Sequence, residues 1–161
     1  MIPAPLRSVL SPYLPISTPW ERTNIRVERI PEEDDNPRSY VFRKITRFTV
    51  PKSLAIRNLE TAGMSVGNDV IINPKYAFFE TASGMALIGH ELFHQSQRAS
   101  IPGFDQKYEQ AAMNTPMSRP WENPFELPAY QVEAEIYNDL VSQGYPAGDW
   151  VPLGVEVGLG G

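Results

Sequence analysis

The strongest pattern of apolar and polar positions lies between residues 82 and 98 and is typical of a buried helix. This segment contains no proline, and the run Met85–Gly89 is almost wholly apolar. Thr81 and Ser83 stand at its start, and the side-chain oxygens of such residues commonly cap the first turn of a helix. The sequence therefore predicts a largely buried helix over residues 82–98.

A second helix is predicted from about Pro124 or Pro128 to Gln143. Gly144 follows it, and glycine suits the left-handed conformation just past a helix end. Between the two helices, residues 99–123 contain three prolines, which interrupt regular structure. We expect this segment to be a long surface loop with one short helix. Loops of this length often carry function, and this one could form a wall of a cleft.

Two segments in the first half of the chain are predicted to be strands. Residues 25–30 alternate weakly between apolar and polar positions, and residues 40–50 are rich in aromatic and β-branched types. A polar, acidic turn over residues 31–37 separates them. We therefore expect these two strands to pair as a hairpin, followed by an ambiguous segment, 52–61, that could form a short helix.

A second hairpin is predicted over residues 63–73. The turn Gly67-Asn68-Asp69 lies between two short apolar runs, and these residue types tolerate the positive φ of a tight turn. Strand pairs followed by two helices predict an α+β fold. We expect a small twisted β-sheet packed on the first helix and on a second, C-terminal helix.

The two ends of the chain differ from its middle in composition. Five prolines in residues 1–20 favour extended or polyproline conformations. We expect this segment to be an arm that lies across a single domain formed by residues 21–161, with a docking or targeting segment as the alternative. Residues 151–161 are rich in glycine and are expected to form a mobile tail. The predicted apolar anchors of the arm are Leu10, Leu14 and Trp20.

Composition and charge exclude several classes of function. The chain has 161 residues, 42% of them hydrophobic, which suits one globular domain. Its formal net charge of −5 disfavours a phosphate backbone, so no nucleic-acid partner is expected. The absence of cysteine excludes disulfides and thiolate metal sites. With no membrane-length apolar run and no signal peptide, we expect a soluble protein made in the cytoplasm, without membrane insertion.

The most specific chemical signal is His90-Glu91-Leu92-Phe93-His94, an HExxH motif inside the first predicted helix. The chain has two histidines, and both belong to this motif. Residues four apart lie on one face of a helix, so His90 and His94 can reach the same metal ion. Glu91 projects about 100° away around the helix, where it can act on a water beside that ion. This arrangement predicts a zinc site of the metallopeptidase type.

Zinc requires a third protein ligand, and without further histidine or cysteine it must be a carboxylate. Glu126 and Glu133 are seven residues apart and share one face of the second helix. Glu126 also fits a capping box with Asn123 as the cap, although Pro128 moves the expected helix start toward Leu127. From these residues alone, the two glutamates are equally good candidates.

The segment from Gly63 to Arg98 resembles the eCIS-core metallopeptidase-like family. The resemblance is carried by the hairpin Ser65–Val70, by the helix segment Leu87–His94, and by Gln97 at the position of a family glutamine. Related HExxH proteins also carry an element that is similar to Asn123–Glu133.

The resemblance implies a small zincin-like fold in which two histidines and a downstream glutamate hold zinc. In the related element a second glutamate stands where this chain has Pro128. The resemblance therefore implies His90, His94 and Glu126 as the ligands, with Glu133 as a supporting or backup residue. It also implies a possible partner in a contractile injection system or a toxin.

The predicted activity is zinc-dependent hydrolysis of a peptide or protein substrate. Zinc lowers the pKa of water toward about 7, and Glu91 as general base would take its proton and pass it to the leaving amine. We expect the substrate to add as a strand beside Val66 or beside Val70–Asn73. Side chains that could donate to the transition state are Tyr108, Arg119, Tyr130 and Tyr137. Gln97 could bond a metal ligand or cap the helix.

Two other functions remain open at this point. The zinc could stabilise a binding or cargo module that has no turnover, because small domains use metals as structural supports. The chain could also be a toxin or effector protease whose proline-rich arm governs its delivery. The role of Glu91 separates the first of these from the peptidase.

Overall fold

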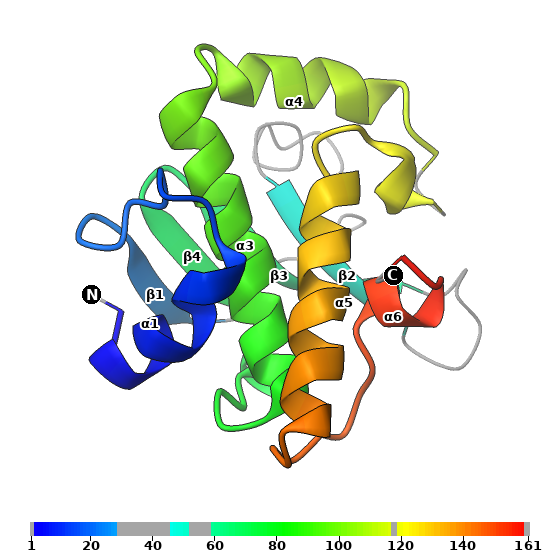
Figure 1. Ribbon diagram of the computed structural model, residues 1–161. Coiled ribbons are helices and arrows are strands. Elements are labelled where there is room, and N and C mark those ends of the chain that lie inside the picture. Colours follow the sequence, from blue (N-terminus) through cyan, green and yellow to red (C-terminus); the bar gives the residue numbers. More distant parts are fainter. Residues whose placement is uncertain (1, 29–45, 52–58, 117–118, 160–161) are drawn as a thin grey trace.

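The computed structural model describes residues 2–28, 46–51, 59–116 and 119–159, and it has an α+β architecture. In this part of the chain a four-stranded sheet lies behind helices α3 and α5, and α4 crosses their upper ends (Figure 1). The elements are α1 (Ala4–Leu10), η1 (Ser11–Tyr13), β1 (Asn24–Val27), β2 (Thr46–Pro51), β3 (Leu59–Val66), β4 (Asp69–Ile72), η3 (Pro74–Tyr76), α3 (Ala82–Ser100), α4 (Phe104–Met113), η4 (Pro120–Glu122), α5 (Leu127–Ser142) and α6 (Leu153–Glu156).

The predicted hairpin over residues 63–73 is confirmed. Strands β3 and β4 pair antiparallel, with Val66 opposite Asp69 at the turn. Gly67 has a φ of 57°, the left-handed conformation that a glycine adopts without strain. The residues of a tight turn act on their immediate neighbours, and here they correctly predicted both strands and their pairing with each other.

The other predicted hairpin is wrong. Strand β1 pairs in parallel with β4, placing Ile25 beside Val70, while β2 pairs antiparallel with β3, so the sheet order is β1-β4-β3-β2. The alternating pattern identified strands, but it carries no information about which strand lies beside which. The expected turn over residues 31–37 lies outside the described residues, as does most of the ambiguous segment 52–61.

The sheet order also corrects the expected substrate position. Strand β4 lies between β1 and β3, and β3 lies between β4 and β2. The backbone groups of both strands already bond to neighbours along the sheet. A peptide therefore cannot add to β4 beside Val70–Ile72 without displacing a strand, and β3 has neighbours on both sides as far as Ser65.

The predicted HExxH helix is confirmed as α3, which continues two residues beyond the expected end. Its first turn is capped by Thr81, whose Oγ1 accepts a hydrogen bond from the Gly84 N–H at 3.1 Å. Helices α3 and α5 approach closely at Gly89, where a Cβ would lie 2.3 Å from Ile136 Cδ1. This close approach holds α5 against the face of α3 that carries the histidines.

Helix α5 begins at Leu127, so the capping box is not formed. Asn123 Oδ1 accepts from the Phe125 N–H at 2.9 Å in a turn before the helix, and Glu126 makes no side-chain cap bond. The Glu126 carboxylate is therefore not occupied in capping the helix. Past the other end of the helix, Gly144 has a φ of 96°, as predicted for a glycine at that position.

Both ends of the described chain pack against the core. Residues 4–13 form α1 and η1 instead of an extended arm, because a proline at the first helical positions is compatible with a helix. Leu10 and Trp20 are buried, and Leu14 packs against the core, as expected of the anchors. Residues 151–159 are not a detached tail: Leu153 is fully buried, and α6 lies against α5.

The described helices differ from membrane-spanning ones in length and composition. None of them is both long and apolar enough to cross a bilayer.

Candidate metal centre

The two histidines of the motif lie side by side on α3. Their rings are 4.8 Å apart between centroids, and the two Nε2 atoms are 3.1 Å apart. Both side chains are completely buried. The one-turn spacing of His90 and His94 therefore brings two ligand nitrogens to one point inside the protein.

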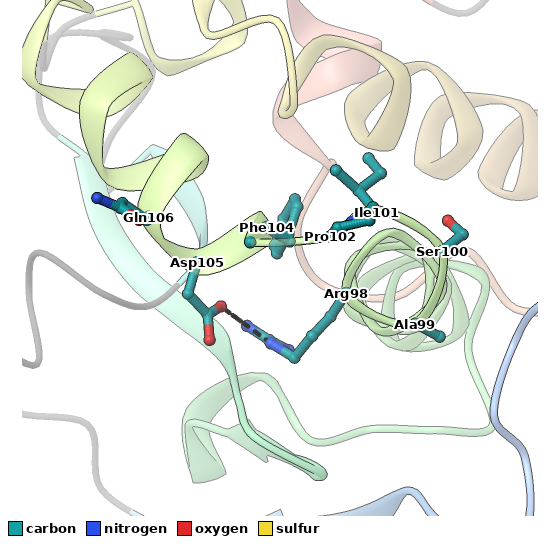
Figure 2. Close-up of a pocket in the computed structure, with 9 residues that line it drawn as sticks. Arg98, Ala99, Ser100, Ile101, Pro102, Phe104, Asp105 and Gln106 are labelled. Atoms are coloured by element: carbon teal, nitrogen blue, oxygen red, sulfur yellow. Dashed lines mark hydrogen bonds and ion pairs between the residues drawn. The ribbon is translucent and has the colours of Figure 1, made fainter.

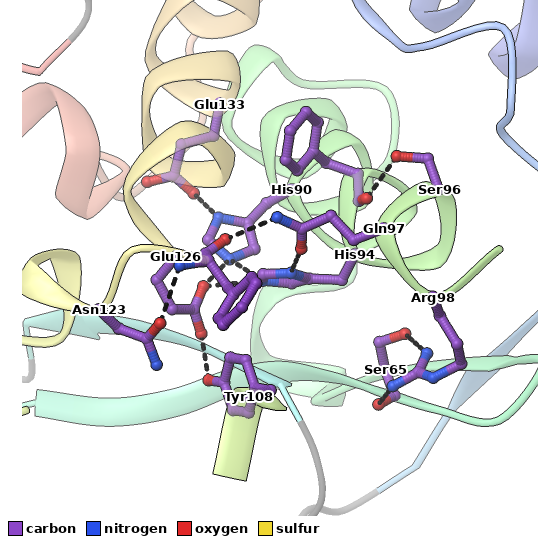
Figure 3. A network of polar contacts seen from close by, with 12 residues as sticks. Ser65, His90, His94, Ser96, Gln97, Arg98, Tyr108, Asn123, Glu126 and Glu133 are labelled. Carbon is purple, nitrogen blue, oxygen red and sulfur yellow. Dashed lines mark hydrogen bonds and ion pairs between the residues drawn. The ribbon is translucent and has the colours of Figure 1, made fainter. Parts of the chain in front are cut away.

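Glu126 supplies the third ligand atom to this point. Its Oε1 lies 2.7 Å from His94 Nε2 and 3.0 Å from His90 Nε2 (Figure 3). Glu126 is itself buried, and the three side chains form a group that could hold a metal ion. The structure thus selects Glu126 from the two glutamates that the sequence left open.

The outer nitrogen of each imidazole, Nδ1, already has a hydrogen-bond partner. This fits metal binding at the inner nitrogen, Nε2, which faces Glu126. His90 Nδ1 lies 3.0 Å from Glu133 Oε2, and His94 Nδ1 lies 2.7 Å from Gln97 Oε1. Since both partners are acceptors, these bonds assign the proton to Nδ1. Once His90 loses its second proton, the Nε2 lone pairs of both rings would point to one place beside Glu126. A ring held in this way by an outer acceptor is typical of histidines that bind metals.

Each supporting residue is held in turn. Gln97 donates through Nε2 to the Phe125 carbonyl oxygen at 3.0 Å, which ties α3 to the segment just before α5. The Tyr108 hydroxyl donates to Glu126 Oε2, which leaves Oε1 directed at the histidines. Glu133 Oε1 accepts from the Gly154 N–H at 2.8 Å.

The pKa values within the cluster follow from burial and from these bonds. Burial alone would lower the His90 pKa, but bonds with Glu126 and Glu133 outweigh it and raise the pKa to about 10. Burial lowers the pKa of His94. Burial would raise the pKa of Glu126, but both histidines hold it well below its usual range. In the metal-free protein His90 therefore carries a positive charge that a metal ion would replace.

Glu91 is the most unusual polar side chain of the region. It is fully buried, and neither carboxylate oxygen finds a hydrogen-bond partner within the described residues. Burial raises its pKa to about 8, opposed by His90 and reinforced by Glu126 and Glu133. Gly63 of β3 leaves room for it, since a Cβ there would lie 3.3 Å from Glu91 Oε2. A buried carboxylate without a partner is costly, which indicates that it serves a ligand.

Helix α4 covers the cluster. It confirms the short helix expected at about Asp105–Met113, but it does not lie on a surface loop, because Phe104 and Tyr108 are buried. The Phe104 ring lies 5.5 Å from Phe125 and 6.4 Å from His94, and the Tyr108 ring lies 6.1 Å from His94. These aromatic side chains fill the space beside the ligands.

Comparison with known protein families agrees with this geometry. Residues 52–102 match the eCIS core domain. The match confirms the resemblance seen in the sequence. It covers β3, β4 and the two histidines, whereas Glu126 and α5 lie outside it. Comparison with curated proteins found no match, and comparison with solved structures found none either.

The other candidate residues divide into those that lie at the histidine cluster and those that lie away from it. The Tyr130 ring meets the His90 ring edge to face at 4.6 Å, so Tyr130 lies at the cluster. Tyr137 packs against the hydrophobic core instead, and Arg119 forms an exposed ion pair with Glu122 at 3.4 Å. The structure therefore keeps Gln97, Tyr108 and Tyr130 beside the ligands.

Two contacts were missed by sequence reasoning. Tyr108 was considered only as a donor to the transition state, but its hydroxyl bonds Glu126. Gly154 was placed in a tail, but its N–H bonds Glu133. Neither contact has a spacing signal, because each joins segments that are distant along the chain.

A separate pocket lies at the junction of α3 and α4, and the eCIS core match ends within its lining. Its volume is about 500 Å³, and residues 98–106 line it (Figure 2). Arg98 crosses it to pair with Asp105 at 2.9 Å. The pocket does not include the histidines or Glu126, so it is distinct from the buried cluster.

Proposed function

We propose that this protein is a zinc-dependent peptidase of zincin-like architecture, acting on a peptide or protein substrate. His90, His94 and Glu126 hold the metal, and Glu91 is the general base. One observation carries the proposal: a convergent set of three ligand atoms lies beside a buried carboxylate that has no hydrogen-bond partner among the described residues. A purely structural cluster would have no use for that carboxylate.

The donor set supports zinc as the metal. Two imidazole nitrogens and one carboxylate oxygen are typical of catalytic zinc sites, in which three protein ligands leave one position open. Structural zinc sites are usually closed by four protein ligands. The supports on both imidazoles, Glu133 and Gln97, are of the kind that orient zinc-binding histidines.

The chemistry of the residues follows from their placement. When bound, zinc would polarise the substrate carbonyl and make water more acidic. Glu91 would take the proton from the attacking water and deliver it to the leaving amine. Burial raises its pKa to about 8 in the metal-free protein, and a nearby cation lowers the pKa of a carboxyl group, so these opposing effects suit a group that both accepts and donates a proton.

Access to the centre requires a movement. The ligands are buried, and Phe104 and Tyr108 of α4 occupy the space beside His94. A peptide carbonyl would have to displace these rings to approach the metal. Substrate or a partner protein could provide the binding energy for this displacement.

A second candidate function is a zinc-stabilised binding or cargo module of a contractile injection system. The complete burial of the cluster favours it, together with the match to the eCIS core domain. In that case zinc would join α3 to the start of α5 and no bond would be cleaved. Glu91 would then be dispensable.

The Glu91→Gln variant separates the two functions. A general base contributes about 10²–10⁴-fold to the rate, so we expect zinc-loaded Glu91→Gln to keep its metal and lose at least 100-fold in cleavage of an unstructured peptide library, scored by mass spectrometry of new N-termini. Glu135→Gln, an exposed change on α5, is the matched control and should cleave normally. Absence of cleavage by the zinc-loaded wild-type protein would favour the binding module.

A further inference from the structure

The segment after α5 returns to the metal centre. The chain reverses direction beyond Ser142, and α6 then lies beside α5 (Figure 1). Leu153 is fully buried in the core and holds this short helix in place. The next residue, Gly154, faces Glu133.

Gly154 approaches α5 too closely for any other residue. Its N–H donates to Glu133 Oε1 at 2.8 Å. A Cβ at this position would lie 2.3 Å from the Tyr130 carbonyl oxygen and 3.0 Å from the same Glu133 oxygen. The first of these distances involves backbone, which cannot rotate away. Only glycine therefore allows this hydrogen bond at this spacing.

Glu133 connects that contact to the ligands. Its second oxygen, Oε2, accepts from His90 Nδ1 at 3.0 Å, and the side chain is completely buried. Each carboxylate oxygen of Glu133 thus accepts one hydrogen bond, and neither oxygen contacts solvent. The orientation of Glu133 is set by the C-terminal segment at one end, and it sets the orientation of the His90 ring at the other.

We propose that Gly154 is a positioning residue of the metal centre, which fixes Glu133 and through it His90. The C-terminal segment is then required for full metal affinity although it supplies no ligand. Outer partners of metal-binding histidines typically affect metal affinity by about 10–100-fold. This inference rests on the metal site of the proposed function and is independent of peptidase turnover.

The test is a metal titration of the full chain and its variants. Zinc affinity is measured by competition with a chromophoric chelator, and the cobalt(II) absorption spectrum reports the ligand geometry. We expect Gly154→Ala to weaken zinc binding at least tenfold and to alter the cobalt spectrum. Gly158→Ala is the matched control: it adds a methyl group in the same segment where nothing lies within 4 Å, at a φ of 74° that strains it. The control should leave affinity within about twofold.

A double-mutant cycle shows whether Gly154 acts through Glu133. We expect Glu133→Gln alone to weaken zinc binding by about 10–100-fold, and Gly154→Ala to add less than about threefold in that background. If the two losses multiply instead, or if Gly154→Ala binds zinc as tightly as wild type, the inference is overturned while the metal site stands. A wild-type protein that binds no zinc overturns the proposed function as well.

A second measurement does not use the Gly154 variant, so it tests the inference even if that variant fails to fold. Zinc should slow amide hydrogen exchange at Gly154 at least tenfold in the wild-type protein, with little change at Gly158. In Glu133→Gln this protection should disappear. Equal protection at Gly154 with and without the Glu133 carboxylate would contradict the inference.

Discussion

At the scale of single residues, the centre depends on how the two oxygens of Glu126 divide their contacts. Oε1 faces both histidines, and Oε2 accepts from Tyr108. A carboxylate held at one oxygen presents the other to a metal in a fixed direction. The same logic applies to each histidine, whose Nδ1 is held by Glu133 or Gln97 so that its Nε2 points toward Glu126 Oε1.

Tyr108→Phe tests this division of contacts. The change removes the hydroxyl bond to Glu126 while keeping the ring that packs beside His94. We expect zinc affinity, measured by chelator competition, to fall about tenfold. Tyr145→Phe, at a partly buried position on the core, is the control and should bind zinc normally. An unchanged affinity in Tyr108→Phe would show that Glu126 needs no such support.

The sequence predicted part of this site, and the limit has a physical cause. His90, Glu91 and His94 are visible because one turn of helix fixes their relative positions. The choice between Glu126 and Glu133 depends on where α5 starts and on what lies opposite it. Glu126 is directed at the histidines because it precedes the helix, whereas Glu133 reaches the outer side of His90. No spacing rule contains that information.

At the scale of elements, local signals were reliable and pairings between distant segments were not. The hairpin β3–β4 and the start of α3 were predicted correctly, because a turn and a capping residue act on their immediate neighbours. The parallel pairing of β1 with β4 was missed, since it joins residues more than forty positions apart. The packing of α6 on α5 was also missed, because no local signal connects two segments that are separated by a turn.

Leu10→Ala tests whether α1 belongs to the core or is a detachable arm. Leu10 is fully buried, and such a truncation leaves a cavity that costs about 2–5 kcal/mol. We expect the free energy of unfolding, measured by urea denaturation, to fall by that amount. Ile16→Ala, at a fully exposed position, should change it by less than about 0.5 kcal/mol. Equal stability of the two variants would mean that the N-terminal segment contributes nothing to the fold.

At the scale of the whole molecule, the chain buries three glutamates and two histidines in one region. Without a metal, burial raises the pKa of Glu91 to about 8 and that of Glu133 to about 7, and bonds to carboxylates raise the pKa of His90 to about 10. These groups therefore bind protons more tightly in the folded state than in the unfolded one. The metal-free fold loses their contribution as pH rises.

This linkage predicts that rising pH lowers the Tm of the metal-free protein and enlarges the Tm increase caused by zinc. The pKa of an unfolded-state glutamate is 4.5, so the contribution of Glu91 and Glu133 is complete below that pH and is lost up to pH 7–8. The contribution of His90 is lost between pH 6.5 and about 10. The Tm of the EDTA-treated protein should therefore fall between pH 6 and pH 8.5. Zinc competes with protons for the ligands, so the Tm increase it causes should grow over the same interval. A metal-free Tm that rises with pH would contradict this account.

The central claim is that the buried cluster binds zinc. The most direct test is the metal content of the purified protein by elemental mass spectrometry, before and after incubation with zinc, beside a His94→Ala variant. The account predicts about one zinc per chain in the wild-type protein and loss of that zinc in the variant. A folded wild-type protein that holds no zinc even after incubation would contradict it.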